Sequence, residues 1–208
     1  MIRLAPSGVN IDMSNTICRL IAVLAILVTI TGCTSVHVQD YKNNTPKLVL
    51  EDYFAGKTTA WGIFRDRFGK VRKRFVVDVK GEWDAQAQKL VLREDFQYDD
   101  GTKETREWHL KKTGANSYEG TAGNVVGSAK GRTSGNAFHF NYRFDLPVED
   151  SSWRVTFDDW MYLQPDGQTL INIATISKWG VRLGTVHIFF RKDGASADKQ
   201  AGVDNLTR

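Results

Sequence analysis

The sequence predicts an all-β fold: a single antiparallel up-and-down barrel of about 8–10 strands, placed after an N-terminal signal and tether. Three observations predict it. Short runs of alternating apolar and polar residues follow one another from Thr59 onward. Turn-forming residues separate these runs at intervals of about ten residues. The same region lacks the periodicity of an amphipathic helix. A two-sheet sandwich would give the same pattern and is the structural alternative.

Two runs, Phe75–Trp83 and Phe138–Leu146, show the alternation most clearly. Each has an apolar and a polar face, because successive side chains of a strand point to opposite sides. The apolar faces are Phe75, Val77, Val79 and Trp83 in the first run, and Phe138, Phe140, Tyr142, Phe144 and Leu146 in the second. Such faces either fill a core or line a cavity, and the sequence leaves both possibilities open.

Turn signals delimit the other strands. Asp99–Gly101 and Pro165–Gly167 are typical of tight connections between antiparallel strands. The strands expected around these turns and at the end of the domain are Leu90–Tyr98, Thr105–Lys112, Trp153–Leu163, Thr169–Ser177 and Val181–Arg191. Leu48–Phe54 is either a short helical turn or a first strand. Closing this meander into a barrel would remove exposed strand edges and leave a lumen for one small ligand.

The segment Thr121–Asn136 departs from the pattern because four glycines punctuate it and Gly120 directly precedes it. No helix pattern follows it, so it is not a nucleotide-binding loop. Glycines in strands mark bends or close approaches of the backbone. The segment is therefore either a strongly bent barrel corner or a cradle for a ligand.

The N-terminal residues have the pattern of a secretory signal, with Arg19 before the apolar run Leu20–Val28. The run is too short for a membrane span, which needs about 20 apolar residues. The following Ile30–Cys33 resembles the bacterial lipobox, which implies cleavage before Cys33 and acylation of that cysteine. An uncleaved anchor and a signal without lipidation are the alternatives. Met13 would begin a more usual signal than Met1.

The chain is accordingly divided into four segments. Residues 1–32 are predicted to be a lipoprotein signal peptide, 33–47 the lipidated cysteine and tether, 48–192 the β-barrel domain, and 193–208 a disordered tail. Cys18 leaves with the signal and Cys33 carries the lipid, so the mature domain has neither a disulfide nor a free thiol. Its core alone must hold it together.

Position and charge indicate the compartment and exclude one class of partner. The residue after Cys33 is Thr34. In the enteric sorting rule, Asp at this position retains a lipoprotein at the inner membrane. Resemblance to that rule therefore implies that this protein is located at the outer membrane, facing the periplasm. Loss of residues 1–32 removes two cations and one anion, so the formal charge falls from +4 to +3. A surplus this small gives no support for nucleic-acid binding.

The sequence shows no constellation of catalytic or metal-binding residues. His37 lies in the tether, and His109, His139 and His187 lie on separate strands without the short spacing of metal ligands. There is no Gly-x-Ser-x-Gly elbow. We therefore expect no metal, no cofactor and a role other than catalysis, while a lipid-modifying enzyme stays open only through contacts between residues distant in the sequence.

The adjacent carboxylates Asp158 and Asp159, in Phe157–Leu163, invite comparison with a catalytic pair. Neighbours on a strand point to opposite faces, so these two are not expected to act together. Asp159 shares its face with apolar residues and is the inward candidate. The residues that share this face are Trp153, Val155, Phe157, Met161 and Leu163.

A buried Asp159 needs a partner or a raised pKa. Arg65, Arg74 and Arg182 are the possible partners. Asp159 would then be either half of a buried Asp–Arg pair or an acid that binds a ligand. Trp160 shares the opposite face of the strand with Asp158, so that outer face is not fully polar.

Six cations lie within ten residues around Phe68-Gly69, and Asp66 is the one anion among them. The segment reads as a hairpin turn and its flanks. It is either a solvated hairpin or a patch for anionic lipid headgroups, where each basic residue contributes about 1 kcal/mol. Arg72 and Arg74 are the candidates for such contacts.

Several stretches together resemble the domain-of-unknown-function family 3833 of bacterial lipoproteins. They are "AWGIFRDRFGKVRKRF" (Ala60–Phe75), "GEWD" (Gly81–Asp84), "FDDWMYLQPDGQTLINIATISKWGVRLGTVHIFF" (Phe157–Phe190) and the lipobox. The resemblance covers Leu48 to Lys192 and implies a lipid-anchored envelope protein, but no activity and no site. Gly81-Glu82-Trp83 gives a looser similarity to lipocalin-like barrels.

The resulting prediction is an outer-membrane lipoprotein that binds a fatty acid, a phospholipid or another amphiphile in a lipocalin-like barrel. A structural or assembly factor without ligand is the alternative, and a lipid-modifying enzyme the second. The candidate ligand-binding residues are Asp159, Trp83, Phe140, Tyr142, Arg72 and Arg74. The membrane is the expected partner, through acylated Cys33.

Overall fold

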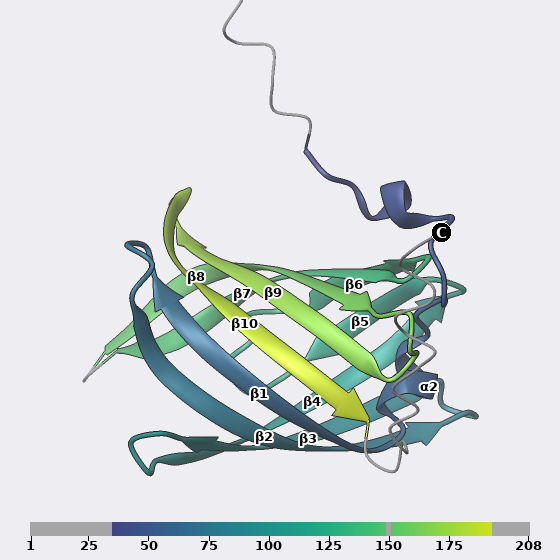
Figure 1. Ribbon diagram of the computed structural model, residues 1–208, viewed down its shortest axis with the longest axis horizontal. Coiled ribbons are helices and arrows are strands. Elements are labelled where there is room, and N and C mark those ends of the chain that lie inside the picture. The colour runs from purple at the N-terminus through teal and green to yellow at the C-terminus, as the bar shows by residue number, and fades with distance from the viewer. Residues whose placement is uncertain (1–34, 149–150, 193–208) are drawn as a thin grey trace, which may run out of the picture. The chain divides into compact units, whose positions relative to one another are not determined.

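The computed structural model describes residues 35–148 and 151–192, and its main feature is a closed barrel of ten antiparallel strands (Figure 1). The strands are β1 (Gly56–Asp66), β2 (Val71–Asp84), β3 (Lys89–Tyr98), β4 (Lys103–Gly114), β5 (Ser117–Thr121), β6 (Ala129–Ser134), β7 (Ala137–Val148), β8 (Ser151–Leu163), β9 (Thr169–Lys178) and β10 (Val181–Lys192). The predicted signal peptide with Cys33, and the predicted tail, lie outside the described residues.

Each strand pairs with the next one along the chain, and β1 pairs with β10 to close the ring. The closing register runs from Thr58 opposite Lys192 to Asp66 opposite Gly184. The predicted all-β up-and-down barrel is confirmed, and the sandwich alternative is excluded. Closure pairs the edges that an open sheet would leave exposed.

The alternation predicted from the sequence sets the inner and outer faces of the wall. Phe75, Val77 and Val79 of β2 are buried and the residues between them are exposed. On β5 and β6, Gly120 and Gly131 stand where an added Cβ would overlap the side chains of Leu110 and Phe138. These two glycines therefore make room for large side chains inside the barrel.

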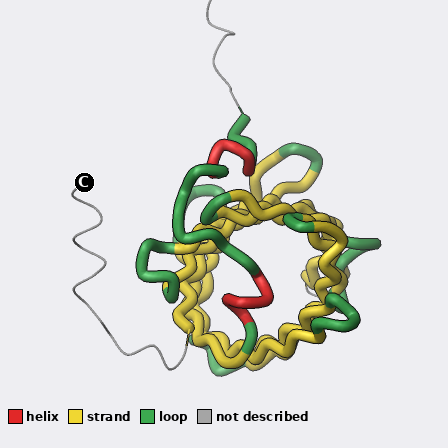
Figure 2. The backbone as a smooth tube through the Cα atoms, turned by 90° about the vertical axis from the view of Figure 1, so that its right-hand side faces the viewer, coloured by secondary structure: helices red, strands yellow, loops and turns green. Residues whose placement is uncertain are grey.

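A short helix, α2 (Leu50–Phe54), closes one end of the barrel (Figure 2). Its one and a half turns place Leu50 and Phe54 on the same face, because residues four apart on a helix are neighbours. Both are almost completely buried. Gly56 follows with a φ of +94°, a conformation natural to glycine, and begins β1. We call this end the closed end and the opposite end the open end.

The 3-10 helix η1 (Val38–Tyr41) packs against β6 and β7 on the outside of the wall. The ring of Tyr41 lies 6.0 Å from that of Trp160 and 5.3 Å from that of Tyr162. This cover explains why the outer side of β8 carries aromatic residues. Val38–Tyr41 lie within the segment that the sequence predicts to be a tether, and in the structure they are folded against the barrel. Among the described residues, no helix is long and apolar enough to cross a membrane.

Candidate functional site: the barrel lumen

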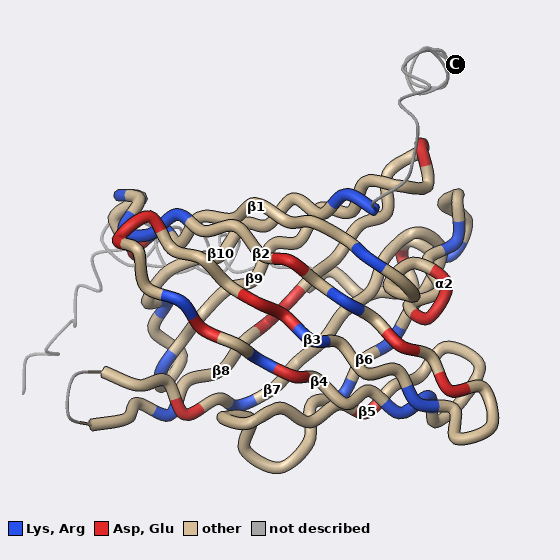
Figure 3. Tube along the Cα trace, turned by 90° about the horizontal axis from the view of Figure 1, so that it is seen from below, with Lys and Arg blue, Asp and Glu red and all other residues tan. Residues whose placement is uncertain are grey.

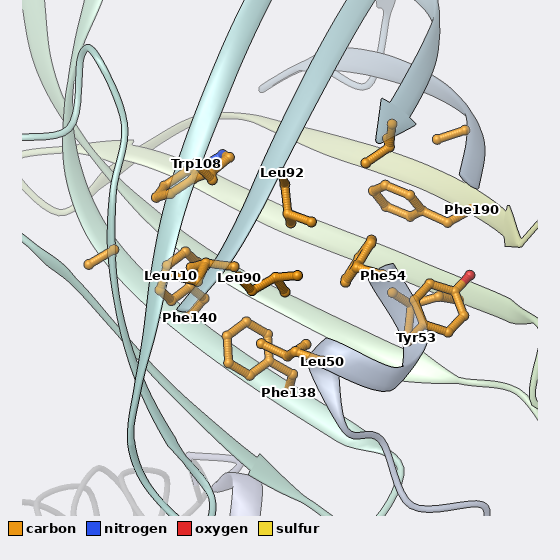
Figure 4. Packing of buried hydrophobic residues seen from close by; sticks show 14 of the residues in the cluster. Leu50, Tyr53, Phe54, Leu90, Leu92, Trp108, Leu110, Phe138, Phe140 and Phe190 are labelled. Carbon is orange, nitrogen blue, oxygen red and sulfur yellow. The ribbon is translucent and has the colours of Figure 1, made fainter. Parts of the chain in front are cut away.

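The barrel is hollow, with an internal cavity of about 460 Å³. This volume falls within the range of about 300–1,000 Å³ typical of small-molecule sites. Leu50 and Phe54 of α2 form its floor against side chains from the wall (Figure 4). Most of the lining is aromatic or aliphatic, so the cavity suits a largely apolar ligand.

The lining changes character along the barrel axis. Near the closed end it is apolar, with Trp108 and Phe138 packed among the core residues. Charged and polar side chains follow in the middle, on both sides of the lumen. Towards the open end the lining is again mainly apolar and includes Phe75, Phe96 and Phe144. A belt of polar side chains, which we call the polar belt, therefore interrupts an apolar tube. Its members are Asp159, Asn172, Glu94 and Arg106.

Asp159 of β8 belongs to the polar belt and is only 7 % exposed. Its partner is Asn172 on β9, whose amide nitrogen donates to Oδ1 of the carboxyl group. Asn172 lies diagonally across the strand pair, because Asp159 itself stands opposite Ala174. Burial raises the pKa of Asp159 to about 7, the charges of Glu94 and Asp158 add to this, and the bond from Asn172 opposes it.

Glu94 and Arg106 form the other side of the belt and stand directly opposite each other on β3 and β4. Their charged atoms are 3.9 Å apart, and Arg106 also makes a 2.9 Å ion pair with Glu104. Burial raises the pKa of Glu94 to about 7 although Arg106 lowers it, while Glu104 raises it further. Glu104 in turn accepts a 3.0 Å hydrogen bond from the Tyr98 hydroxyl.

Three of the predicted ligand-binding residues line the cavity together: Asp159, Phe140 and Tyr142. The other three do not. Trp83 has the inward parity but lies near the closed end, packed against the core outside the cavity lining. Arg72 and Arg74 are exposed on the outer face, in ion pairs with Asp66 and Asp99. The ligand-binding role of all six stays a prediction.

Sequence reasoning missed Glu94, Arg106 and Lys73, which also line the cavity. The signal for all three was present in the alternation. Glu94 shares the parity of Leu90, Leu92 and Phe96, and Arg106 that of Trp108 and Leu110. Lys73 is the one cation of the basic hairpin with the inward parity of Phe75.

The predicted separation of Asp158 and Asp159 is confirmed. Asp158 lies on the outer face, where Oδ1 is 2.5 Å from Nε2 of His139 on β7. The imidazole of His139 also stacks on Trp160, with 4.2 Å between ring centroids. Asp159, in contrast, has Asn172 as its partner, and not Arg65, Arg74 or Arg182 as the sequence suggested.

The outer wall carries an apolar patch over β1, β2, β9 and β10. Its members are 38–47 % exposed: Trp61, Val76, Ile173 and Phe189. Among residues 35–148 and 151–192, no three His, Cys, Asp or Glu side chains are grouped so as to hold a metal ion.

Fold and cavity together define the class of protein: a lipocalin-like β-barrel with an internal site of the size used for small molecules. The chain belongs to the family described as "Protein of unknown function (DUF3833)", which it matches over residues 27–192. Both the family and the fold class expected from the sequence are confirmed.

The solved structures include a similar barrel, the S-type phycobiliprotein lyase CPES from Guillardia theta. The two share 9 % sequence identity with a TM-score of 0.51, over 72 % of this chain and 95 % of the lyase chain. At this identity the likeness is one of fold. No curated protein matches the chain.

Proposed function

We propose that the protein binds one amphiphile, such as a fatty acid or a phospholipid, inside the barrel, and that acylation of Cys33 holds it at the outer membrane facing the periplasm. The cavity of about 460 Å³ with an aromatic lining and a polar belt carries this proposal. An apolar tube takes a hydrocarbon chain through the hydrophobic effect. The polar belt gives the head of the ligand a place to make hydrogen bonds.

Lipid extraction of the purified protein, followed by mass spectrometry, tests ligand binding. We expect a lipid at about one molecule per chain. Ala174→Phe would fill the lumen beside Asp159 and should abolish the co-purifying lipid. Ile173→Phe, on the outer face of the same strand, is the matched control and should keep it. Circular dichroism establishes that both variants are folded.

A wild-type protein that carries no lipid and takes up no fluorescent fatty acid would contradict the proposal. Anchoring is tested separately by growth with a radiolabelled fatty acid, which should label the wild-type protein covalently and leave Cys33→Ser unlabelled. A wild-type protein without label would contradict the acylation but leave the ligand proposal standing.

The exposed apolar patch on the outer wall favours the alternative of a structural or assembly factor. Contiguous exposed apolar surface often marks a site of protein interaction. Its members are Trp61, Val76, Ile173 and Phe189. This alternative predicts that the lumen stays empty of lipid, so the same extraction distinguishes it from ligand binding.

One observation favours an enzyme. Glu94 and Asp159 both line the cavity, and the pKa of each is raised to about 7, a range suited to general acid–base work at neutral pH. Against this, none of the described residues that line the cavity is a Ser, Cys or His. Conversion of an extracted lipid during incubation with wild-type protein, lost in Asp159→Asn, would support catalysis.

A further inference from the structure

We propose that the polar belt selects the head of the ligand, and that Asp159 binds an amphiphile whose head is an amine rather than a carboxylate. This proposal rests on the binding function proposed above and narrows the class of ligand. It is carried by the arrangement of charges in the lumen, in which acidic groups outnumber the available cations.

The acidic groups of the lining are Glu94, Glu104 and Asp159, and its cations are Arg106 and Lys73. Arg106 is already engaged by Glu94 and Glu104. Lys73 has a half-exposed side chain, 3.7 Å from Asp100. A carboxylate that entered the lumen would therefore meet like charges and no free cation, which disfavours its ionised form.

Asp159 is the group that lacks a charge partner. Among the described residues, no Lys, Arg or His lies within ion-pair distance of it, and Asn172 is its one hydrogen-bond donor. A carboxyl group has two oxygens and accepts several hydrogen bonds, so acceptor capacity remains. A buried carboxylate without a cation is costly, and an ammonium group would supply both the charge and strong hydrogen bonds.

The order of residues along β8 fixes how such a ligand enters. Val155 and Phe157 share the inward parity of Asp159 and precede it from the open end, and Met161 and Leu163 follow towards the closed end. Beyond Asp159 the cavity ends on the floor formed by Leu50 and Phe54, and its other end is open. A ligand that enters from the open end therefore goes in with the amine first, and its hydrocarbon chain lies along the aromatic lining towards the open end.

Displacement of the neutral dye Nile red by three dodecyl amphiphiles tests this inference. Dodecylamine, dodecanol and dodecanoate share one chain and differ only in the head. At about pH 8, where Asp159 is largely ionised, we expect dodecylamine to bind at least about tenfold more tightly than dodecanoate. Dodecanol should lie between them.

Asp159→Asn should remove the preference for the amine and leave the affinity for dodecanol unchanged. Asp158→Asn makes the same chemical change one residue away, on the outer face, and should retain the preference. Equal affinities for the three heads, dodecanoate as the tightest ligand, or a preference that survives in Asp159→Asn would overturn the headgroup inference while the proposed function stands. Failure of all three amphiphiles to displace the dye would overturn both.

Independently, we infer that the rim of the open end docks on an anionic lipid bilayer. The two adjacent hairpins of this rim, β1–β2 and β9–β10, each present an aromatic side chain to solvent at the tip. Phe68 is 79 % exposed and Trp179 is 91 % exposed. The hairpins are neighbours because β1 pairs with β10. Aromatic rings at such positions are typical of contacts with the membrane interface.

A cation lies over each ring, and the positive charge of the two hairpins matches an anionic surface. The guanidinium of Arg67 lies 4.7 Å from the ring centre of Phe68, and the amine of Lys178 lies 4.8 Å from that of Trp179. Among the described residues, Arg67, Lys70, Lys178 and Arg182 have no ion-pair partner. Figure 3 shows Lys and Arg in the β1–β2 hairpin at the end opposite α2. Such cations are attracted to the negative surface potential of an anionic membrane.

Sedimentation with lipid vesicles tests the rim. The mature chain, residues 33–208 with Cys33→Ser, is used as the background, so that neither the proposed acyl chains nor the apolar run Leu20–Val28 contributes. We expect it to bind vesicles containing phosphatidylglycerol more tightly than vesicles of phosphatidylcholine alone, and to be released by salt. Phe68→Ser with Trp179→Ser should weaken binding to the anionic vesicles at least about tenfold.

Trp61→Ser is the matched control, because Trp61 is also exposed but lies on the outer wall away from the rim. It should leave vesicle binding unchanged. Equal binding to both kinds of vesicle, or an unchanged affinity of the double variant, would overturn the docking inference. These outcomes have no bearing on Nile red displacement, so the lumen and the rim are tested separately.

Discussion

The two ends of the barrel are built from the same ten strands and similar tight turns, yet they differ in nearly every other respect. The closed end is filled: α2 enters it, and Leu50 and Phe54 pack against the wall. At the open end the lumen reaches solvent, and the hairpin tips present Phe68 and Trp179 without cover. One end is therefore organised as a core, and the other is open to solvent, as the proposed contacts with a ligand and a membrane require.

Their electrostatics differ in the same way. At the closed end Glu51 is buried, paired with Lys112 and hydrogen-bonded by the Tyr118 hydroxyl at 2.8 Å. Burial would raise the pKa of Glu51, but these partners outweigh it and lower the pKa below its ordinary value. Asp159, towards the open lumen, has a raised pKa instead. A carboxyl group with a cation thus serves the fold, and one without a cation is available to a ligand.

The largest expected effect comes from deleting the same side chain at each end. Phe54→Ala removes a fully buried ring that packs on Phe190 with 5.8 Å between centroids. We expect it to lower the free energy of unfolding by about 3–5 kcal/mol. Phe68→Ala, at the exposed tip, should change it by less than about 0.5 kcal/mol. Urea denaturation measures both, and equal losses would contradict the contrast between the two ends.

The next effect concerns the buried ion pair. Glu51→Gln leaves Lys112 without its counter-charge and should cost about 3 kcal/mol at neutral pH. Because the pKa of Glu51 is lowered by folding, its contribution is present above pH 4.5 and is lost as the pH falls through the folded-state value. The gap between wild type and variant should therefore close in acid. Glu82→Gln, in an exposed pair with Lys80, should leave the melting temperature unchanged at either pH.

The contrast between the ends also separates what the sequence predicted from what it did not. Alternation is local, so it located the inner faces of β2 and β7 and placed Asp159 inside. It did not give the depth of a residue along the axis, so Trp83 had the correct parity but lies near the closed end. The sequence did not decide whether α2 is a helix or a strand. A segment of five residues such as Leu50–Phe54 takes its structure from the barrel wall around it.

The partner of Asp159 was wrong for a related reason. Arg65, Arg74 and Arg182 have the charge to pair with a carboxylate, but all three are exposed in the folded chain. The partner is Asn172, which has the inward parity on the neighbouring strand. Shear between strands decides which inward residues meet, and it follows from the closure of the whole barrel rather than from any single run.

A smaller effect is expected from Asp159 itself. Its pKa is raised to about 7 in the folded protein, so its folded state holds the proton more firmly than the unfolded state does. Wild type should therefore lose stability as the pH rises from about 4 to about 7, by up to about 4 kcal/mol at about 1.4 kcal/mol for each pKa unit. Asp159→Asn lacks this loss and should be the more stable protein at about pH 8.

Thermal unfolding of wild type and Asp159→Asn across this pH range measures the difference. Glu94, whose pKa is also raised to about 7, titrates in both proteins, so the difference between them reports Asp159 together with its repulsion by Glu94. A variant less stable than wild type at every pH would mean that Asp159 has a stabilising partner. The reading of this carboxyl as a group kept for a ligand would then fail.

The smallest effects should come from glycines with free space around them. An added Cβ at Gly101, in the β3–β4 turn of the open end, or at Gly123, in the loop after β5, meets no atom within 4 Å. Gly101 has a φ of +83°, so Gly101→Ala should cost about 1 kcal/mol through backbone conformation alone. Gly123 does not have a positive φ, so Gly123→Ala should be neutral or stabilise by about 0.5 kcal/mol.

At the closed end a methyl group at Gly81 would overlap the carbonyl oxygen of Phe54. Gly81→Ala should therefore cost more than either, and a loss no greater than that of Gly101→Ala in the same urea titration would show that α2 is free to move out of the barrel.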